Sequence, residues 1–266
     1  SNGEILKGFD VEYAGVTGYL FNEYSPSDSF NLAKFQKTCL ELISILDKKN
    51  IIPIVVGGTG LYIDSLVKGY TLVQDEPNFA LRESLIGSPS EILFEKLLSI
   101  NSDLANSLNE SDRYNPQRLI RAIEKSSSTL ADKTGSVDRY VKPENKKVLE
   151  SLIIYPKYNR DELFEKINTR VEKMFDIGLI DEVKSLVEAG FADSIPINGI
   201  GYKEVAQYIN SQISLDECKD KIKQGHRNYA KRQITWFESS GRGYNLMKFD
   251  FQEEIDKIFD SIVNFL

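Results

Sequence analysis

The stretch Ile51–Tyr62 reads IIPIVVGGTGLY. Its first six residues are apolar throughout, which is typical of a short strand that a parallel sheet buries between two helical layers. The two glycines that follow permit a tight turn into a helix. A helical pattern over residues 28–49, with Asp28 as its expected N-cap, precedes the run;. This order predicts an α/β fold whose ligands gather at the carboxyl ends of the strands, where Gly57–Gly60 lies.

The pattern changes between about residues 73 and 146, where amphipathic helical stretches alternate with polar segments and no buried strand is expected;. An apolar, strand-like run returns at residues 148–155. A pair of helices broken at Gly178 is then expected over residues 160–188, and one further helix over residues 215–239;. The sequence thus predicts an α/β core formed by residues 1–72 and 147–266, which a mainly helical insertion, residues 73–146, interrupts.

Composition bounds the class of protein. The chain has 266 residues, of which 41% are hydrophobic and 27% charged, ordinary values for a soluble globular protein;. Its two cysteines are too few and too far apart for a disulfide framework or a metal cluster;. No run approaches the roughly 18 apolar residues of a membrane span, so a cytoplasmic location is expected. The net charge of −7 argues only weakly against a nucleic-acid partner, because local clusters of basic residues decide such binding;.

Thr59 directs a hydroxyl group from a turn in which Gly57, Gly58 and Gly60 let a ligand approach the backbone;. Two explanations fit this arrangement. The turn binds a substrate, or it is an ordinary strand-to-helix turn whose threonine caps the helix. The turn alone favours the second explanation.

A helix is expected from Pro116, with Asn115 as its cap;. Arg118 and Arg121 share one face of it, and two cations near a helix start oppose the helix dipole unless an anionic partner is present. Glu124, three residues beyond Arg121, is an alternative partner. A phosphate contact and an internal ion pair therefore explain the pattern equally well.

The stretch Lys223–Phe237 reads KQGHRNYAKRQITWF. Basic residues recur in it at four-residue steps and predict a stripe along one helix face: Lys223, Arg227 and Lys231. Because few acids interrupt the stretch, it favours an anionic partner such as a single-stranded RNA loop over an ordinary solvated helix face. The chain's only histidine, His226, cannot form a metal site by itself.

Two other segments each have a functional and an ordinary explanation. Arg170 is either a phosphate clamp or the partner of a nearby acid, and its spacing favours the acid. The segment Asn198–Glu204 places glycines before a helix, which suits backbone contacts with a phosphate or a ribose but also suits a plain turn;.

Taken in order, these motifs closely resemble the successive motifs of bacterial tRNA dimethylallyltransferases. The resemblance extends from about Lys7 to about Phe237, and its most specific element is AKRQITW at residues 230–236. The matching segments are Val56–Tyr62, Asn115–Arg118, Arg170 with the MxxxGLxxEV-type continuation from Met174, Gly199–Glu204, and Ala230–Phe237.

The resemblance implies a P-loop NTPase-like parallel sheet, with the helical insertion gripping the anticodon stem-loop of a tRNA. The implied reaction transfers a dimethylallyl group from dimethylallyl diphosphate to N6 of adenosine 37, with Mg²⁺ on the diphosphate. Thr59 would hold the reacting centre in the pocket formed by the glycines of its turn, and Arg170 would neutralise the departing diphosphate. The implied tRNA contacts are Arg82, Gln117, Arg118, Arg121, Gly199, Gly201, Tyr202, Lys203, Arg227, Lys231, Arg232, Gln233 and Trp236.

Two elements of the family pattern have no counterpart in this sequence. One is the glycine-rich loop ending in Gly-Lys-Thr or Gly-Lys-Ser, which cradles the diphosphate. The other is an Asp-Ser-x-Gln element whose aspartate is the expected base; Ser1 and Glu4 align with its Asp and Gln positions. We therefore expect the 266-residue chain to be a monomer and an inactive fragment of an active enzyme. The alternatives are a degenerate relative that binds the anticodon stem-loop without catalysis, a prenyltransferase acting on free adenine nucleotides, and a small-molecule kinase.

Overall fold

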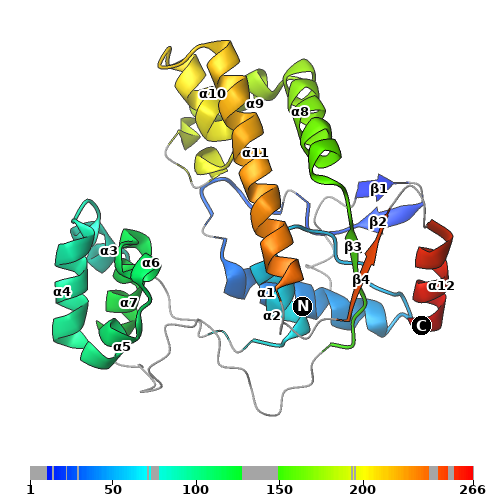
Figure 1. Ribbon diagram of the computed structural model, residues 1–266, viewed down its shortest axis with the longest axis horizontal. Coiled ribbons are helices and arrows are strands. Elements are labelled where there is room, and N and C mark those ends of the chain that lie inside the picture. The colour runs from blue at the N-terminus through cyan, green and yellow to red at the C-terminus, as the bar shows by residue number, and fades with distance from the viewer. Residues whose placement is uncertain are drawn as a thin grey trace. The chain divides into compact units, whose positions relative to one another are not determined.

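The computed structural model describes residues 11–13, 15–21, 23–28, 30–70, 72, 78–127, 149–192, 194, 196–239, 245–250 and 255–265. Its chain separates into two compact units (Figure 1). Residues 1–68 and 148–266 form unit 1, and residues 69–147 form unit 2. The units are described separately below.

Unit 1 begins with a short antiparallel hairpin of β1 (Val11–Tyr13) and β2 (Val16–Gly18), followed by the helices α1 (Leu32–Asp47) and α2 (Gly60–Val67). The expected cap of α1 was wrong by three residues. Asn31 caps the helix through its side chain, whereas the carboxylate of Asp28 accepts from the backbone N–H of Ser25 at 2.7 Å. The apolar face of α1 is buried as its 3.6-residue period predicts;.

The run at residues 51–56 does not form the buried strand that its composition predicted. Ile54 and Val56 are 81% and 90% exposed. A strand needs a neighbour to satisfy its backbone N–H and C=O groups, and within the described ranges no strand pairs with this run. The segment nevertheless leads directly into α2, so that Thr59 stands at the start of that helix.

A small parallel sheet is present elsewhere in unit 1. It consists of β3 (Ile153–Pro156) and β4 (Leu246–Phe249), in which Ile153 pairs with Leu246 and Tyr155 with Lys248. A final helix, α12 (Ile255–Phe265), follows β4. The prediction of an α/β fold with a parallel sheet is confirmed in this reduced form.

The remaining helices of unit 1 pack around one apolar core. They are α8 (Arg160–Asp176), α9 (Leu179–Leu186), the π-helical turn η2 (Val187–Phe191), the 3-10 turn η3 (Pro196–Asn198), α10 (Tyr202–Ile209) and α11 (Leu215–Glu238). The break expected at Gly178 is confirmed, since its φ of 104° suits glycine alone;. The buried core residues are Val171, Leu179, Val183, Ile197, Val205, Cys218 and Ile222.

The long helix α11 connects this core to the start of the chain. Its first half packs on α8 and α10, and its second half reaches α2 (Figure 1). Phe237, near its end, lies 5.7 Å from the ring of Tyr155 on β3, measured between ring centroids. Residues more than 150 positions apart in the sequence are thereby brought together at the C-terminal half of α11.

Unit 2 is entirely helical in its described part. It contains α3 (Phe79–Leu85), α4 (Ser90–Ile100), α5 (Ser102–Ser107), α6 (Glu110–Arg113) and α7 (Pro116–Ser127). The core lies mainly between α4 and α7 and consists of Leu85, Leu93, Leu97, Leu104, Ala105, Leu108, Leu119, Ala122 and Ile123. Asn115 accepts from the backbone N–H of Arg118 at 3.2 Å, which confirms it as the cap of α7.

None of the helices in the described ranges is both long enough and apolar enough to cross a membrane.

Candidate active site

Thr59 occupies the N-cap position of α2 but does not cap the helix with its side chain. Its Oγ1 instead lies 3.1 Å from the phenolic oxygen of Tyr229 on α11. The ordinary explanation, in which this threonine caps the following helix, is therefore wrong. A threonine cap stabilises a helix by about 0.5–2 kcal/mol, so the hydroxyl group forgoes a local stabilisation to face α11.

The two glycines on either side of Thr59 also contact α11 closely. Gln233 donates from Nε2 to the backbone oxygen of Gly58 at 2.9 Å. A Cβ atom at Gly58 would lie 1.8 Å from that nitrogen, and one at Gly60 would lie 2.1 Å from Cδ1 of Trp236. At Gly60 a side chain would meet the ring of Trp236, whereas at Gly58 it would displace the flexible end of Gln233 and break its hydrogen bond. Gly57, by contrast, has no atom within 4 Å of such a Cβ.

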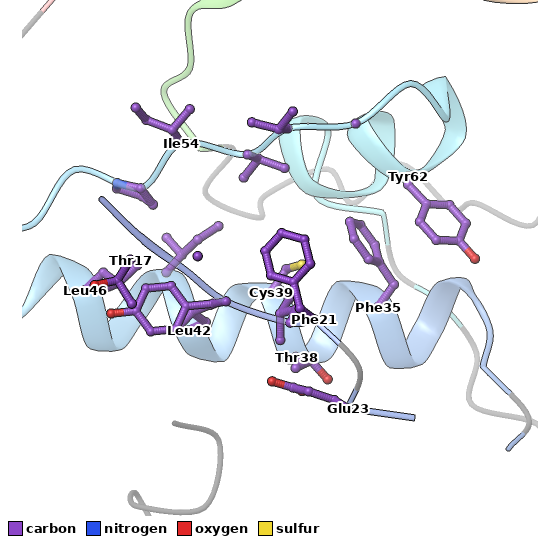
Figure 2. A pocket seen from close by; sticks show the side chains of 18 of the residues that line it. Thr17, Phe21, Glu23, Phe35, Thr38, Cys39, Leu42, Leu46, Ile54 and Tyr62 are labelled. Carbon is purple, nitrogen blue, oxygen red and sulfur yellow. The ribbon is translucent and has the colours of Figure 1, made fainter. Parts of the chain in front are cut away.

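A cavity of about 1140 Å³ opens beside this turn and includes Thr59 in its lining. Phe35, Cys39 and Leu42 of α1 line one side, and Ile54 and Tyr62 line the other (Figure 2). The ring centroids of Phe35 and Tyr62 lie 4.5 Å apart. Pockets for drug-sized ligands measure about 300–1000 Å³. This cavity is therefore large enough for a drug-sized ligand and exceeds the space that a dimethylallyl group alone would need. It offers apolar surface next to Thr59 without defining the size of a substrate.

One basic residue of α11, Arg232, stacks on the aromatic side chain that contacts Thr59. The guanidinium group of Arg232 sits 5.6 Å from the centroid of the Tyr229 ring, the ring whose hydroxyl group meets Thr59. Lys231, which precedes it in sequence, lies 5.8 Å from the centroid of the Phe164 ring on α8, and both basic side chains are exposed. Arg232 and Thr59 are thus connected through one aromatic side chain, which places a positive charge near the candidate reacting centre.

The basic stripe predicted on α11 faces α8, which supplies groups that one helix alone does not reveal. Glu172 of α8 binds Lys219 and Lys223, and these two ammonium groups lower the pKa of its carboxyl group to about 2. Arg227 donates to Asn168 of α8 at 3.0 Å and also to Gln224 of its own helix. The N-terminal part of the stripe, Lys223 and Arg227, therefore stabilises the packing of α8 on α11.

Arg170 is exposed on α8, and among the described residues its guanidinium group forms no hydrogen bond or ion pair. The acid partner that its spacing suggested is therefore not seen. Burial, assisted by the charge of Arg170, lowers the pKa of His226 on α11. Arg170 is accordingly available to an anion on the surface formed by α8 and α11.

In unit 2, two arginines predicted to contact tRNA share one buried carboxylate. Arg82 donates to Glu124 from Nε at 3.0 Å and from Nη2 at 2.9 Å, and Arg121 binds the same group. The backbone N–H of Asn78 adds a fourth donor at 2.7 Å. Although burial alone would raise it, these donors hold the pKa of Glu124 below its ordinary value. The cluster keeps one excess positive charge.

Two further candidates lie at the beginning of α7. Arg118 forms an ion pair with Asp112, so both arginines of this helix have acidic partners inside unit 2. Gln117 is exposed. The internal ion pair that the sequence offered as an alternative is present, and a role in RNA binding has to rest on the exposed side chains and on the cluster's excess charge.

The turn at residues 199–203 is largely occupied by internal contacts. Gly201 has a φ of 100°, and its backbone N–H donates to Glu204 at 2.8 Å. The hydroxyl group of Tyr202 donates to Glu182 at 2.5 Å; burial, with this hydrogen bond, raises the pKa of Tyr202 to about 12. Gly199 and Lys203 remain exposed. The amide predicted to bind a phosphate therefore already has an acceptor.

The structure brings Gly58, Thr59 and Gly60 together with Gln233 and Trp236, as one site. The sequence did not predict that Tyr229 belongs to this site through its hydrogen bond with Thr59. The available signal was the position of this tyrosine four residues before Gln233, which places both on one helix face. Ser1 and Glu4, the positions aligned with the family's base element, lie outside the described residues.

The described residues contain no group of three or more His, Cys, Asp or Glu side chains placed to hold a metal ion. Mg²⁺ is commonly bound by one or two carboxylates together with substrate phosphates and water. Such an ion would therefore depend mainly on oxygens of a bound diphosphate.

Comparisons with known proteins agree with the order of the motifs. A family model described as IPP transferase matches residues 7–240. A tRNA dimethylallyltransferase from Anoxybacillus flavithermus is 34% identical over 99% of this chain and 86% of its own length.

Two solved structures extend the comparison. The full-length tRNA isopentenylpyrophosphate transferase from Bacillus halodurans is similar with a TM-score of 0.61 and 30% identity, over 92% of this chain and 76% of that one. A eukaryotic dimethylallyltransferase acting on tRNA has a TM-score of 0.69 at 20% identity, over 91% of this chain and 63% of that one, which supports the fold.

Proposed function

The chain belongs to the IPP transferase family, and on this premise we propose that it prenylates tRNA at N6 of the adenosine next to the anticodon, adenosine 37. The donor in this proposal is dimethylallyl diphosphate. Its curated relatives are tRNA dimethylallyltransferases, so that the transfer of a prenyl group to tRNA is the activity of the family. The identity of the base, the donor and the anticodon stem-loop are the parts that we add.

The reaction forms one bond and breaks another. The lone pair of N6 attacks the first carbon of the allylic group, the bond from that carbon to oxygen breaks, and the electron pair leaves with the diphosphate. The alkylated amino group then loses one proton, which passes to water or to the released diphosphate. Because an adenine amino group is a weak nucleophile, catalysis depends on alignment of the two substrates and on stabilisation of the departing anion.

The observation that carries this proposal is the hydroxyl group of Thr59, which does not cap α2. It faces away from the helix that it would ordinarily stabilise, and it lies beside an apolar cavity and near the cation Arg232. An allylic diphosphate needs these features in one place: apolar surface for its tail, a hydroxyl group at the reacting centre and positive charge for its phosphates. Arg170 would assist by neutralising the diphosphate as it leaves.

The proposed partner is the anticodon stem-loop, bound by basic, polar and aromatic residues and by backbone groups in each unit. In unit 2 these are Arg82, Gln117, Arg118 and Arg121. In unit 1 they are Gly199, Gly201, Tyr202, Lys203, Arg227, Lys231, Arg232, Gln233 and Trp236. Planar and cationic side chains suit the unstacked bases and phosphates of an RNA loop. A monomer acting in the cytoplasm, with Mg²⁺ carried by the diphosphate, completes the proposal.

A transfer assay with the full-length enzyme tests this function. The enzyme is incubated with dimethylallyl diphosphate labelled in its allylic group and with either tRNA or free AMP, and the modified nucleoside is identified by mass spectrometry. We expect label in tRNA, at adenosine 37, and none in AMP. Label in AMP alone would indicate a nucleotide prenyltransferase, and binding of the stem-loop without transfer would indicate a protein that has lost catalysis.

A further inference from the structure

We propose that Tyr229 is a positioning residue for the transfer reaction, because its hydroxyl group holds that of Thr59 away from α2 and toward the site. This inference rests on the proposed function. It adds a residue that the motifs did not assign, and it separates two tasks on α11, where neighbouring side chains hold the turn and bind the RNA.

The first step of the argument is the direction of the Thr59 side chain. At an N-cap, a threonine oxygen normally accepts from a backbone N–H two or three residues ahead. Here the backbone N–H of Tyr62 donates to the backbone oxygen of Thr59 at 2.9 Å, and the side-chain oxygen makes no cap bond. Within the described residues, the hydrogen bond to Tyr229 is what competes with capping for this hydroxyl group.

The second step is the rigidity of the support. Tyr229 lies on a helix of 24 residues, and its neighbours on the same face fix the turn on both sides of Thr59. Gln233 binds the Gly58 oxygen, and Trp236 covers Gly60. A functional group is held accurately when rigid elements and their hydrogen bonds fix its rotamer. The three side chains of α11 therefore set the backbone of the turn, and Tyr229 sets the hydroxyl group.

The third step is the chemistry left to Thr59. A threonine hydroxyl group has one proton to donate and two lone pairs that accept. Bound to Tyr229, it keeps part of this capacity for a substrate atom in a fixed direction. Without the tyrosine hydroxyl group, Thr59 is free to turn back and cap α2 in most molecules, which leaves only a fraction of the enzyme with this hydroxyl group directed at the substrate.

The substitution Tyr229→Phe removes only this hydroxyl group. In the full-length enzyme we expect kcat for tRNA prenylation to fall by about 3- to 10-fold, the change that one hydrogen bond of ordinary net strength gives. KM for both substrates should remain unchanged. The midpoint of urea unfolding should not fall, since Thr59 gains a cap as it loses Tyr229. In a Thr59→Ala background the same substitution should have no further effect on kcat. Tyr208→Phe, on α10 beside the apolar core, is the matched control and should behave like the parent.

A crystal structure of the Tyr229→Phe variant gives a second measurement that does not depend on activity. It should show Oγ1 of Thr59 turned toward the backbone N–H groups of α2. An unchanged Thr59 rotamer, a parental kcat, or an equal loss of kcat with and without Thr59 would each overturn the inference. If the parent enzyme transfers no prenyl group to tRNA, the proposed function fails instead, and the crystal structure still decides whether Tyr229 positions Thr59.

Discussion

Gln233 donates its side-chain amide to the backbone oxygen of Gly58 at 2.9 Å, across 175 positions of the sequence. This bond joins the most specific motif of the C-terminal helix to the glycine turn that opens α2. The two motifs are therefore parts of one site. The distances between α11 and the turn allow several substitutions to be predicted with matched controls.

The glycine turn offers a pair of substitutions that differ mainly in the space around them. Gly60→Ala places a methyl group 2.1 Å from the Trp236 ring, whereas Gly57→Ala places one in open space. Overpacking costs about 1–3 kcal/mol, so Gly60→Ala should lower the free energy of unfolding by that amount and Gly57→Ala by much less. The chain's single tryptophan allows both to be followed by fluorescence during urea unfolding. Equal stabilities would contradict the close contact of α11 with the turn.

Thr59→Ala tests the hydroxyl group itself. We expect kcat for prenyl transfer to fall by about 10- to 1000-fold, because an interaction at the reacting centre acts mainly in the transition state. Affinity for tRNA should remain nearly unchanged, as the methyl group and hydroxyl group contact no phosphate in the proposal. Thr59→Ser, which keeps the hydroxyl group, should retain most of the activity. A Thr59→Ala enzyme as fast as the parent would remove Thr59 from the site.

Local pattern predicted the helices well and the long-range pairing poorly. The periods that indicated α1 and α7 depend only on residues three or four apart, and both helices bury the expected faces. The exposure of residues 51–56 was not predictable, because a strand forms only with a neighbour that the local sequence does not contain;.

The charges show the same limit. The pairing of Arg121 with Glu124 was one of the two explanations that the sequence offered, since the two residues lie three apart on one helix. The pairing of Lys223 with Glu172 was not, because α8 and α11 are separate in sequence and meet only in the fold. Likewise, Thr59 was expected to cap its own helix until Tyr229, 170 positions away, was placed beside it.

Arg232→Ala tests the RNA contact of α11. If the guanidinium group of Arg232 binds a phosphate, its removal should weaken tRNA binding and reduce the slope of log affinity against log salt by about 1. Lys221→Ala removes an equal charge from the same helix, at a residue already paired with Glu217 at 2.9 Å, and serves as the control. Affinities measured at several salt concentrations should change for the first variant only. Parallel changes would mean that net charge, and not position, controls binding.

Glu124→Gln tests the buried carboxylate of unit 2. The substitution leaves Arg82 and Arg121 without their charged acceptor, so it should cost about 1–3 kcal/mol at pH 7. Because the folded-state pKa of Glu124 is lowered from 4.5, its contribution is complete above pH 4.5 and is lost as the pH falls through the folded value;. Urea unfolding at pH 7 and pH 4 should therefore show a smaller difference between variant and parent at pH 4. Glu95→Gln, an exposed change on α4, should show no such trend.

Arg170→Ala tests the proposed contact with the departing diphosphate. Loss of a cation that acts on charge developing in the transition state should reduce kcat by about 100- to 1000-fold. Arg170→Lys should recover part of this loss, since it restores the charge but not the two-pronged hydrogen bonding of a guanidinium group. The affinity for tRNA should remain close to that of the parent in both variants. A large loss of tRNA affinity with unchanged kcat would instead identify Arg170 as an RNA contact.

His226 provides a readout of Arg170 that requires no substrate. It is the only histidine in the chain, so its ring protons give an unambiguous NMR signal. Burial and the positive charge of Arg170 both lower its pKa from 6.5, and only the second is removed in Arg170→Ala. The titration midpoint of His226 should therefore move upward in Arg170→Ala, toward but not beyond 6.5, and should move little in Arg170→Lys, which keeps the charge. An identical midpoint in all three proteins would contradict an approach of the Arg170 guanidinium group to His226 on α11.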